Sequence, residues 1–118
     1  MRMWMINPAL LCRKHLLGEH NEIHLHLHIF LKHRSIHGRI YPVVQIVPER
    51  MQMRHNTLVE EMLHRGYRHQ SPYEQPNLNY LSDDERYAHV DIAYNLADLS
   101  RRCKECRERI AMHYIDDF

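Results

Sequence analysis

The sequence predicts an all-α fold: a compact single domain built on three main helices. Long stretches repeat apolar residues at helical spacing. The one β-branched run, at residues 39–47, contains Pro42 and has no second candidate strand to pair with, so it is expected to be an extended connector. The chain has 118 residues, of which 44% are apolar and 26% are charged, which is enough apolar material for one core but not for two. We therefore expect one domain that spans residues 1–118.

The first helix is predicted from about Cys12 to Lys32, after an extended stretch at residues 1–7. One side of this helix is apolar, with Leu16, Leu17, Ile23, Leu27, Phe30 and Leu31. Another side carries polar groups that recur about once per turn: His15, Glu19, Glu22 and His26. The first helix is therefore expected to hold both core and site residues.

A second helix is predicted from Pro48 to about Arg65, because Pro favours the first helical position and Gly66 is a natural stop. Its core stripe is expected to include Met51, Leu58 and Met62. A third helix is predicted from an N-cap at Ser82 to about Arg109. Its inward side is expected to hold Val90, Ala93, Tyr94 and Ala97, with Ile92 and Leu96 as further candidates.

Charge is distributed unevenly along the chain, although the formal net charge is only +1. Residues 1–39 contain six Lys and Arg against two Glu, which is +4, and seven of the twelve histidines. The remaining residues contain ten Lys and Arg against thirteen Asp and Glu, which is −3. A basic N-terminal part is typical of polyanion binding, and a solvated charged face is the alternative interpretation.

The sequence also indicates where the protein works. It has no apolar run near the roughly 18 residues that a membrane span needs, and its first eleven residues lack the features of a signal peptide. Three cysteines, an odd number, favour reduced thiols. We expect a monomer in the cytoplasm of a bacterial or phage-infected cell, without contact with a membrane.

Three blocks of sequence resemble the pyrimidine-dimer DNA glycosylases, the phage endonuclease V type of repair enzyme and its bacterial relatives. The first block joins Met1-Arg2-x-Trp4 to His15-Leu-Leu-Gly-Glu-His-x-Glu22, and the second is Arg54-His-x-x-Leu-Val-Glu-Glu-Met-Leu-His-Arg-Gly-Tyr67. The third and weakest is Val90-Asp-Ile-Ala-x-x-x-Ala-x-Leu99. The resemblance implies three helices with an N-terminal arm that threads between them.

The resemblance also implies a reaction. Family members release a damaged pyrimidine and then nick the backbone by β-elimination, through a Schiff base with the N-terminal α-amine. By this likeness Met1 supplies the amine and Glu22 the acid and base. An α-amine has a pKa of about 7.7–8.0, against about 10.4 for lysine, so a nucleophilic fraction exists at neutral pH. The partner is double-stranded DNA with a lesion, and the expected contacts are Arg2, Lys14, His15, Asn21, His26 and Arg102.

The chain departs from the phage enzymes near Glu22. Asn21 stands where they carry an arginine, His26 lies in the segment that replaces a second arginine, and their aromatic, lysine-rich C-terminal tail is absent. Pyrimidine dimers are the default substrate, and another damaged or modified base is an alternative. A DNA-binding helical module without catalysis is a second hypothesis.

Histidine and cysteine patterns raise a third hypothesis, a metal-binding protein. His20, His24 and His28 recur one turn apart, and Cys103-Lys-Glu-Cys106 is half of a zinc motif that Cys12 extends only if the fold brings it there. An exposed polar stripe and a pair of small helix residues are the favoured interpretations. No metal and no cofactor is therefore predicted.

Overall fold

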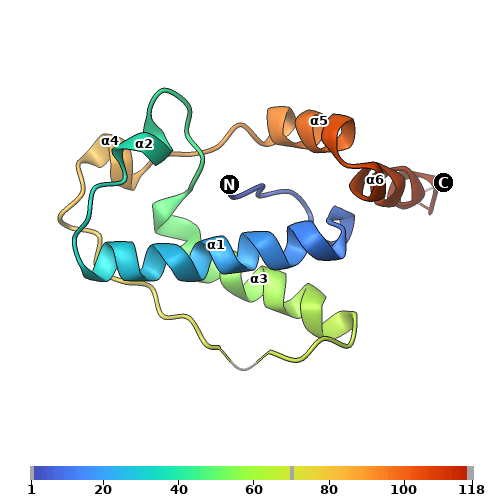
Figure 1. Ribbon diagram of the computed structural model, residues 1–118, viewed down its shortest axis with the longest axis horizontal. Helices are drawn as coiled ribbons and strands as arrows, with labels where there is room; N and C mark the ends of the chain where they lie inside the picture. Colours follow the sequence, from blue (N-terminus) through green and yellow to red (C-terminus); the bar gives the residue numbers. More distant parts are fainter. Residues whose placement is uncertain (1, 70, 117–118) are drawn as a thin grey trace.

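The computed structural model describes residues 2–69 and 71–116, with side chains up to His113. Within these ranges the chain is all-helical, as predicted, and contains no strand. Figure 1 shows α1 (Arg13–Leu31) running through the middle of the molecule, with α3 (Met51–His64) crossing it on one side and α5 (Ile92–Arg102) and α6 (Lys104–Asp116) on the other. The remaining elements are short: η1 (Pro8–Leu10), α2 (His37–Ile40), η2 (Pro48–Arg50) and α4 (Asp83–Arg86).

The first two predicted helices are confirmed, because their apolar periodicity matches the faces that they bury. On α1, Leu16, Ile23 and Phe30 are fully buried. The second helix begins with the η2 turn at Pro48 and continues as α3, which buries Met51, Leu58 and Met62. Gly66 adopts φ +84°, the left-handed conformation that ends a helix readily when no side chain is present.

The prediction of one continuous third helix is wrong. Ser82 does cap a helix, through a capping box with Glu85, but that helix is α4 and it ends at Arg86. A new helix, α5, begins at Ile92 after its N-cap Asp91, whose carboxylate accepts a hydrogen bond from the Tyr94 amide. Cys103 then takes an extended conformation, with φ −124° and ψ 113°, and separates α5 from α6.

The predicted inward face of this region is only partly correct: Val90 and Leu96 pack against the core, but the other predicted residues do not. Ile92 and Tyr94 are half-exposed, and Ala93 and Ala97 face solvent, while Asn95, Asp98 and Leu99 are buried. The reason is the N-terminal arm, residues 2–7, which lies between α1 and α5 (Figure 1). The Asn95 amide donates to the carbonyl oxygens of Met3 and Trp4, at 3.3 and 3.2 Å, so α5 turns polar groups toward a polar backbone.

One buried ion pair joins the arm to both central helices. Arg54 on α3 donates to both carboxylate oxygens of Glu19 on α1, at 2.6 and 3.0 Å, and to the Ile6 carbonyl at 2.7 Å. Arg54 lies on the same stripe as Met51 and Leu58, so a charge inside an apolar stripe was the signal for this contact. The sequence did not indicate that Glu19 and Arg54 form a pair.

Candidate active-site cleft

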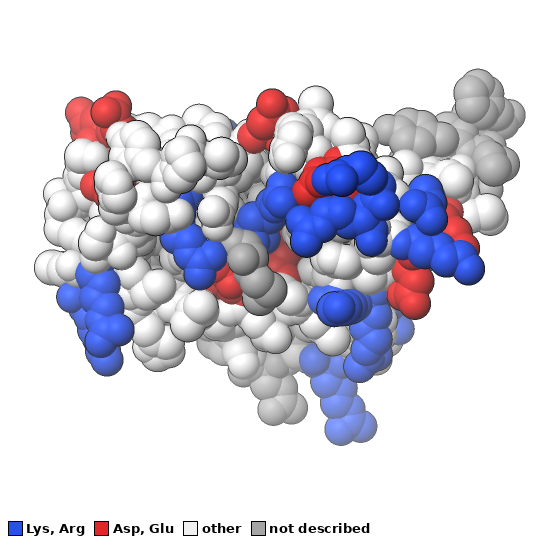
Figure 2. All heavy atoms as spheres, turned by 45° about the horizontal axis from the view of Figure 1, so that its top comes forward, with Lys and Arg blue, Asp and Glu red and all other residues white. Residues whose placement is uncertain are grey.

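A cleft of about 590 Å³ opens between the arm, the first turns of α1, the connector at residues 43–45 and α5. Four of the six predicted DNA contacts line it: Arg2, Lys14, His15 and Arg102. Figure 2 shows Lys and Arg side chains gathered on this face, over the part of the molecule that carries α5 and α6. We call this the basic cleft. A second cleft, of about 620 Å³, mixes Arg13, Arg65 and Arg109 with Glu105 and Glu108 and contains none of the predicted site residues.

Arg2 is held in one orientation at the edge of the basic cleft. Its guanidinium donates to Asn95 Oδ1 and Asp98 Oδ2, both at 2.9 Å, and lies over the Trp4 ring at 4.5 Å. Arg101 and Arg102 also bond to Asp98, and these bonds hold the pKa of its carboxyl below the usual value. Three guanidinium groups share this one carboxylate, which leaves a net positive charge around Asp98 that suits a phosphate backbone.

Glu22 is buried on α1, one turn beyond Gly18, which lines the basic cleft. Arg39 Nη1 lies 3.0 Å from Glu22 Oε1 and His26 Nδ1 lies 3.8 Å from the same oxygen. Within the described part of the chain, Oε1 nevertheless accepts no hydrogen bond. The Glu22 carboxylate is therefore buried next to a cation, as an ion pair with Arg39.

His26, predicted as a DNA contact, is buried next to Glu22 on α1. Its side chain has no exposed surface, and its Nδ1 lies 2.8 Å from the Glu22 carbonyl oxygen, to which it donates. Burial is the main cause that lowers the pKa of His26, so the ring is neutral at pH 7. A side chain with no exposed surface cannot contact DNA in this conformation.

The remaining predicted site residues differ in whether they reach the basic cleft. Lys14 and Asn21 are exposed on α1, and only Lys14 lines the basic cleft. His15 lines the cleft, but its Nδ1 faces sulfur atoms, and burial together with Lys14 and Arg102 lowers its pKa. It is therefore a neutral ring and not a phosphate-binding cation. Met1, the predicted nucleophile, lies outside the described residues.

Two clusters of metal-ligating side chains form from distant parts of the chain. In each, four potential ligand atoms lie within 4.8 Å of one another. The first, here the Cys₃His cluster, consists of Cys12, His15, Cys103 and Cys106. The second, here the His quartet, consists of His20, His24, His55 and His69. The predicted histidine stripe is thus broken, because His28 stays exposed while His20 and His24 meet histidines from α3 and the following loop.

The His quartet makes stability depend on pH. Burial, followed by the neighbouring His24, His55 and His69, lowers the pKa of His20 from 6.5 to about 4. Between these values the unfolded chain binds a proton that the folded chain excludes, so stability is full above pH 6.5 and falls as the pH drops to about 4. At about 1.4 kcal/mol per pKa unit, His20 contributes at most roughly 3 kcal/mol to this fall.

We therefore expect His20→Gln to flatten the loss of unfolding free energy between pH 6.5 and pH 4. Urea unfolding at half-unit pH steps measures this loss. His28→Gln, which changes an exposed histidine of the same helix, is the matched control and should leave the slope as in the wild type. If the unfolding free energy falls equally steeply with pH in the wild type and both variants, His20 is not the group that causes the fall.

The fold and the basic cleft together define a small helical protein with cationic side chains beside a buried carboxylate. Residues 1–75 match the family model of the pyrimidine dimer DNA glycosylases. Because this match covers more than half of the chain, the protein belongs to that family, as the sequence blocks indicated. The comparisons with curated proteins and with solved structures each return no match.

The family match has clear limits along the chain. It includes α1 with Glu22 and α3 with Arg54, and it ends before α5 and α6. The third sequence block, residues 90–99, therefore lies outside the matched residues. The family name implies DNA glycosylase activity on DNA with pyrimidine dimers. Within the described residues, no helix is long and apolar enough to cross a membrane.

Proposed function

We propose that the protein is a DNA glycosylase with β-elimination lyase activity, which acts on pyrimidine dimers or a related damaged pyrimidine through a Schiff base. The observation that carries this proposal is Glu22: a buried carboxylate that pairs with the Arg39 cation at 3.0 Å and lies one helical turn from Gly18, which lines the basic cleft. The family membership supplies the substrate class.

The proposed nucleophile is the Met1 α-amine. Its neutral form attacks C1′ of the damaged nucleotide, the glycosidic bond breaks, and the pyrimidine leaves with the bonding electron pair and takes up the proton that the attacking amine loses. Glu22 donates a proton to the deoxyribose ring oxygen as the ring opens, which gives an iminium between the amine and C1′. No metal or redox cofactor is needed for these steps.

Strand cleavage follows from the same two groups. The Glu22 carboxylate removes a proton from C2′, the electrons form the C2′–C3′ double bond, and the 3′ phosphate leaves. Water then hydrolyses the imine and restores the amine. The buried His26 ring donates to the Glu22 backbone carbonyl at 2.8 Å, and the Arg39 cation lies 3.0 Å from the Glu22 carboxylate.

The basic cleft is proposed to hold the DNA backbone. Arg2, Lys14 and Arg102 are its cations, and contacts to phosphates fix the position of a duplex without reading its sequence. Asn95 and Asp98 hold Arg2, while the Met3 amide donates to the Gln45 carbonyl at 2.8 Å. The arm that follows Met1 is therefore anchored, which supports a catalytic role for the terminal amine.

Reductive trapping tests the proposed intermediate. With sodium borohydride and abasic or dimer-containing DNA, we expect a covalent adduct between the protein and DNA, which mass spectrometry of the peptides places at Met1. Reductive dimethylation of the α-amine, or an added N-terminal tag, should abolish the adduct. A C-terminal tag of the same length is the control and should leave trapping unchanged.

One observation favours a non-catalytic DNA-binding module instead: Glu22 is only 2% exposed, so a sugar has to displace part of its cover to reach it. This alternative predicts salt-sensitive DNA binding that survives modification of the amine. Absence of an adduct on every lesion tested, with binding intact and an unblocked Met1 confirmed by intact mass, would replace our proposal with this one.

A further inference from the structure

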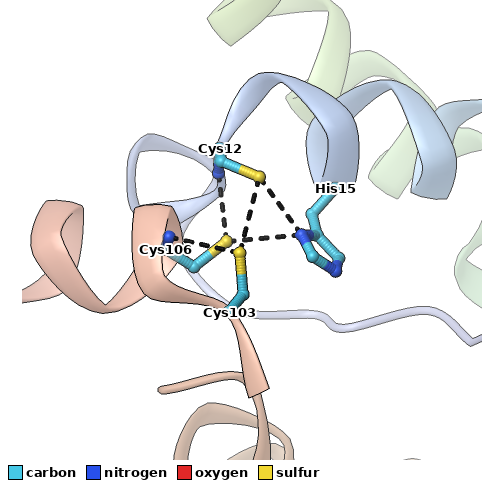
Figure 3. A group of neighbouring side chains, drawn as sticks. All are labelled: Cys12, His15, Cys103 and Cys106. Atoms are coloured by element: carbon cyan, nitrogen blue, oxygen red, sulfur yellow. Dashed lines mark hydrogen bonds between the residues drawn. The ribbon is translucent and has the colours of Figure 1, made fainter. Parts of the chain in front are cut away.

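Two helix N-termini present the same arrangement of ligands to each other. Cys12 precedes α1 and His15 is its third residue, while Cys103 precedes α6 and Cys106 is its third residue. Side chains at these two positions of a helix converge, as they do in a capping box. Figure 3 shows the three sulfur atoms and His15 Nδ1 facing one another, with the second ring nitrogen pointing away.

The separations within the Cys₃His cluster match a tetrahedral metal site. Cys12 Sγ lies 3.9 Å from Cys103 Sγ, and His15 Nδ1 lies 3.1 Å from Cys12 Sγ and 3.5 Å from Cys106 Sγ. Around Zn²⁺, bonds of about 2.3 Å to sulfur and about 2.0 Å to nitrogen place two sulfurs about 3.8 Å apart and sulfur and nitrogen about 3.5 Å apart. No side chain has to move far to coordinate an ion.

Two backbone amides point at sulfur atoms of the cluster. The Cys12 amide donates to Cys106 Sγ at 3.2 Å and the Cys106 amide to Cys103 Sγ at 3.5 Å, and both helices direct the positive ends of their dipoles at the cluster. Three thiolates, one neutral imidazole and a divalent ion give a net charge of −1. The exposed cations Lys14 and Arg102 lie next to cluster residues in sequence and offset this charge.

We propose that Cys12, His15, Cys103 and Cys106 bind one Zn²⁺ in a closed, structural site. Three thiols lose their protons when the ion binds, and no oxidation or reduction takes place. With four protein ligands the ion has no open position for substrate, so the site is separate from the chemistry proposed for Met1 and Glu22.

The bound ion would link α6, which lies outside the family match, to α1, which lies inside it. Cys12 and His15 lie in the matched residues 1–75, whereas Cys103 and Cys106 lie beyond them. His15 also packs edge-on against Trp4, with ring centres 5.7 Å apart, and Arg2 lies over Trp4. The zinc site would thereby hold one wall of the basic cleft.

The His quartet is the competing site, and its hydrogen bonds argue against it. His55 already has oxygen partners on both ring nitrogens: Nε2 lies 3.1 Å from the Ser71 carbonyl oxygen and Nδ1 lies 3.0 Å from Asn56 Oδ1. The same nitrogen lies 3.2 Å from His24 Nε2, and His20 and His69 pair at 3.0 Å. The quartet is already joined by its own hydrogen bonds.

Metal analysis of the full-length chain, without a histidine tag and purified under reducing conditions, tests the proposal. After incubation with Zn²⁺ and desalting, we expect one equivalent of zinc per chain. Replacement by Co²⁺ should give the intense d–d bands and the sulfur-to-cobalt charge transfer of a tetrahedral site rich in thiolates. This spectrum is measured on the wild type, so it does not depend on whether a variant folds.

Variants locate the ion. Cys103→Ser changes the most exposed cysteine of the cluster and should remove the thiolate charge transfer and lower the retained zinc to well below one equivalent. The double variant His24→Asn, His69→Asn, which disrupts the His quartet, is the matched control and should keep one equivalent. Zinc stripped by a chelator should also lower Tm, with recovery when Zn²⁺ is returned.

Several outcomes would overturn the zinc site. The first is that the wild-type protein retains no metal although all three thiols are reduced. The second is that the double variant of the His quartet loses zinc while Cys103→Ser keeps it. The third is an intact mass two hydrogens lower than expected, which would reveal a disulfide in the native protein. Borohydride trapping is a separate measurement. Trapping without zinc would refute only this site, and zinc without trapping would refute only the proposed reaction.

Discussion

Glu22→Gln is expected to lower the rate of base release by about 10²–10⁴-fold, the contribution typical of a general acid–base group. Glutamine keeps the shape of the side chain but can neither give the proton that opens the sugar nor take the C2′ proton afterwards. Single-turnover reaction of a duplex with one cyclobutane dimer measures the two steps separately: alkali converts every cleaved glycosidic bond into a strand break, and samples without alkali report strand nicking alone. Both steps should fail together, because one carboxylate serves both.

The matched control for this variant is Glu60→Gln, which changes an exposed glutamate on α3. It should keep the wild-type rate. Because Glu22 balances the Arg39 cation, the thermal unfolding of Glu22→Gln is measured alongside its activity. A folded Glu22→Gln protein that keeps more than about one-tenth of the wild-type rate would not fit general acid–base catalysis by this residue.

Arg54→Met is expected to destabilise the fold by about 3–5 kcal/mol, because it leaves the Glu19 carboxylate buried without a partner. Glu19 is 2% exposed and Arg54 is 4% exposed, so water does not replace the lost bonds. The same change removes the 2.7 Å bond to the Ile6 carbonyl, so the arm should loosen and activity should fall as well. Urea unfolding at pH 7 measures the stability.

Two further variants test whether the loss of stability comes from the unpaired Glu19 charge. The double variant Glu19→Met, Arg54→Met should recover a large part of the lost stability, since neither charge remains buried. Arg68→Met removes an exposed arginine and should change the unfolding free energy by less than about 0.5 kcal/mol. If Arg54→Met lowers the unfolding free energy no more than Arg68→Met does, the buried pair does not hold the arm in place.

The sequence alone determined the elements whose signals are local. Apolar side chains at helical spacing specified α1 and α3, because a helix of that pattern has only one apolar side to bury. Gly66 and Ser82 marked a helix end and a helix start by backbone and capping chemistry that depends on nearby residues alone. The motifs around Glu22 and Arg54 led to the family in the same way.

Only the tertiary structure decided which distant groups meet. The inward face of α5 is polar because it receives the arm and Arg2, and nothing in its own periodicity indicates that neighbour. His15 and His26 share one helical face with Glu22, yet the first turns to sulfur atoms contributed from residues 103–106 and the second is sealed in the core. Helical spacing fixes which residues share a face, but the partner that this face meets depends on how helices far apart in the chain pack.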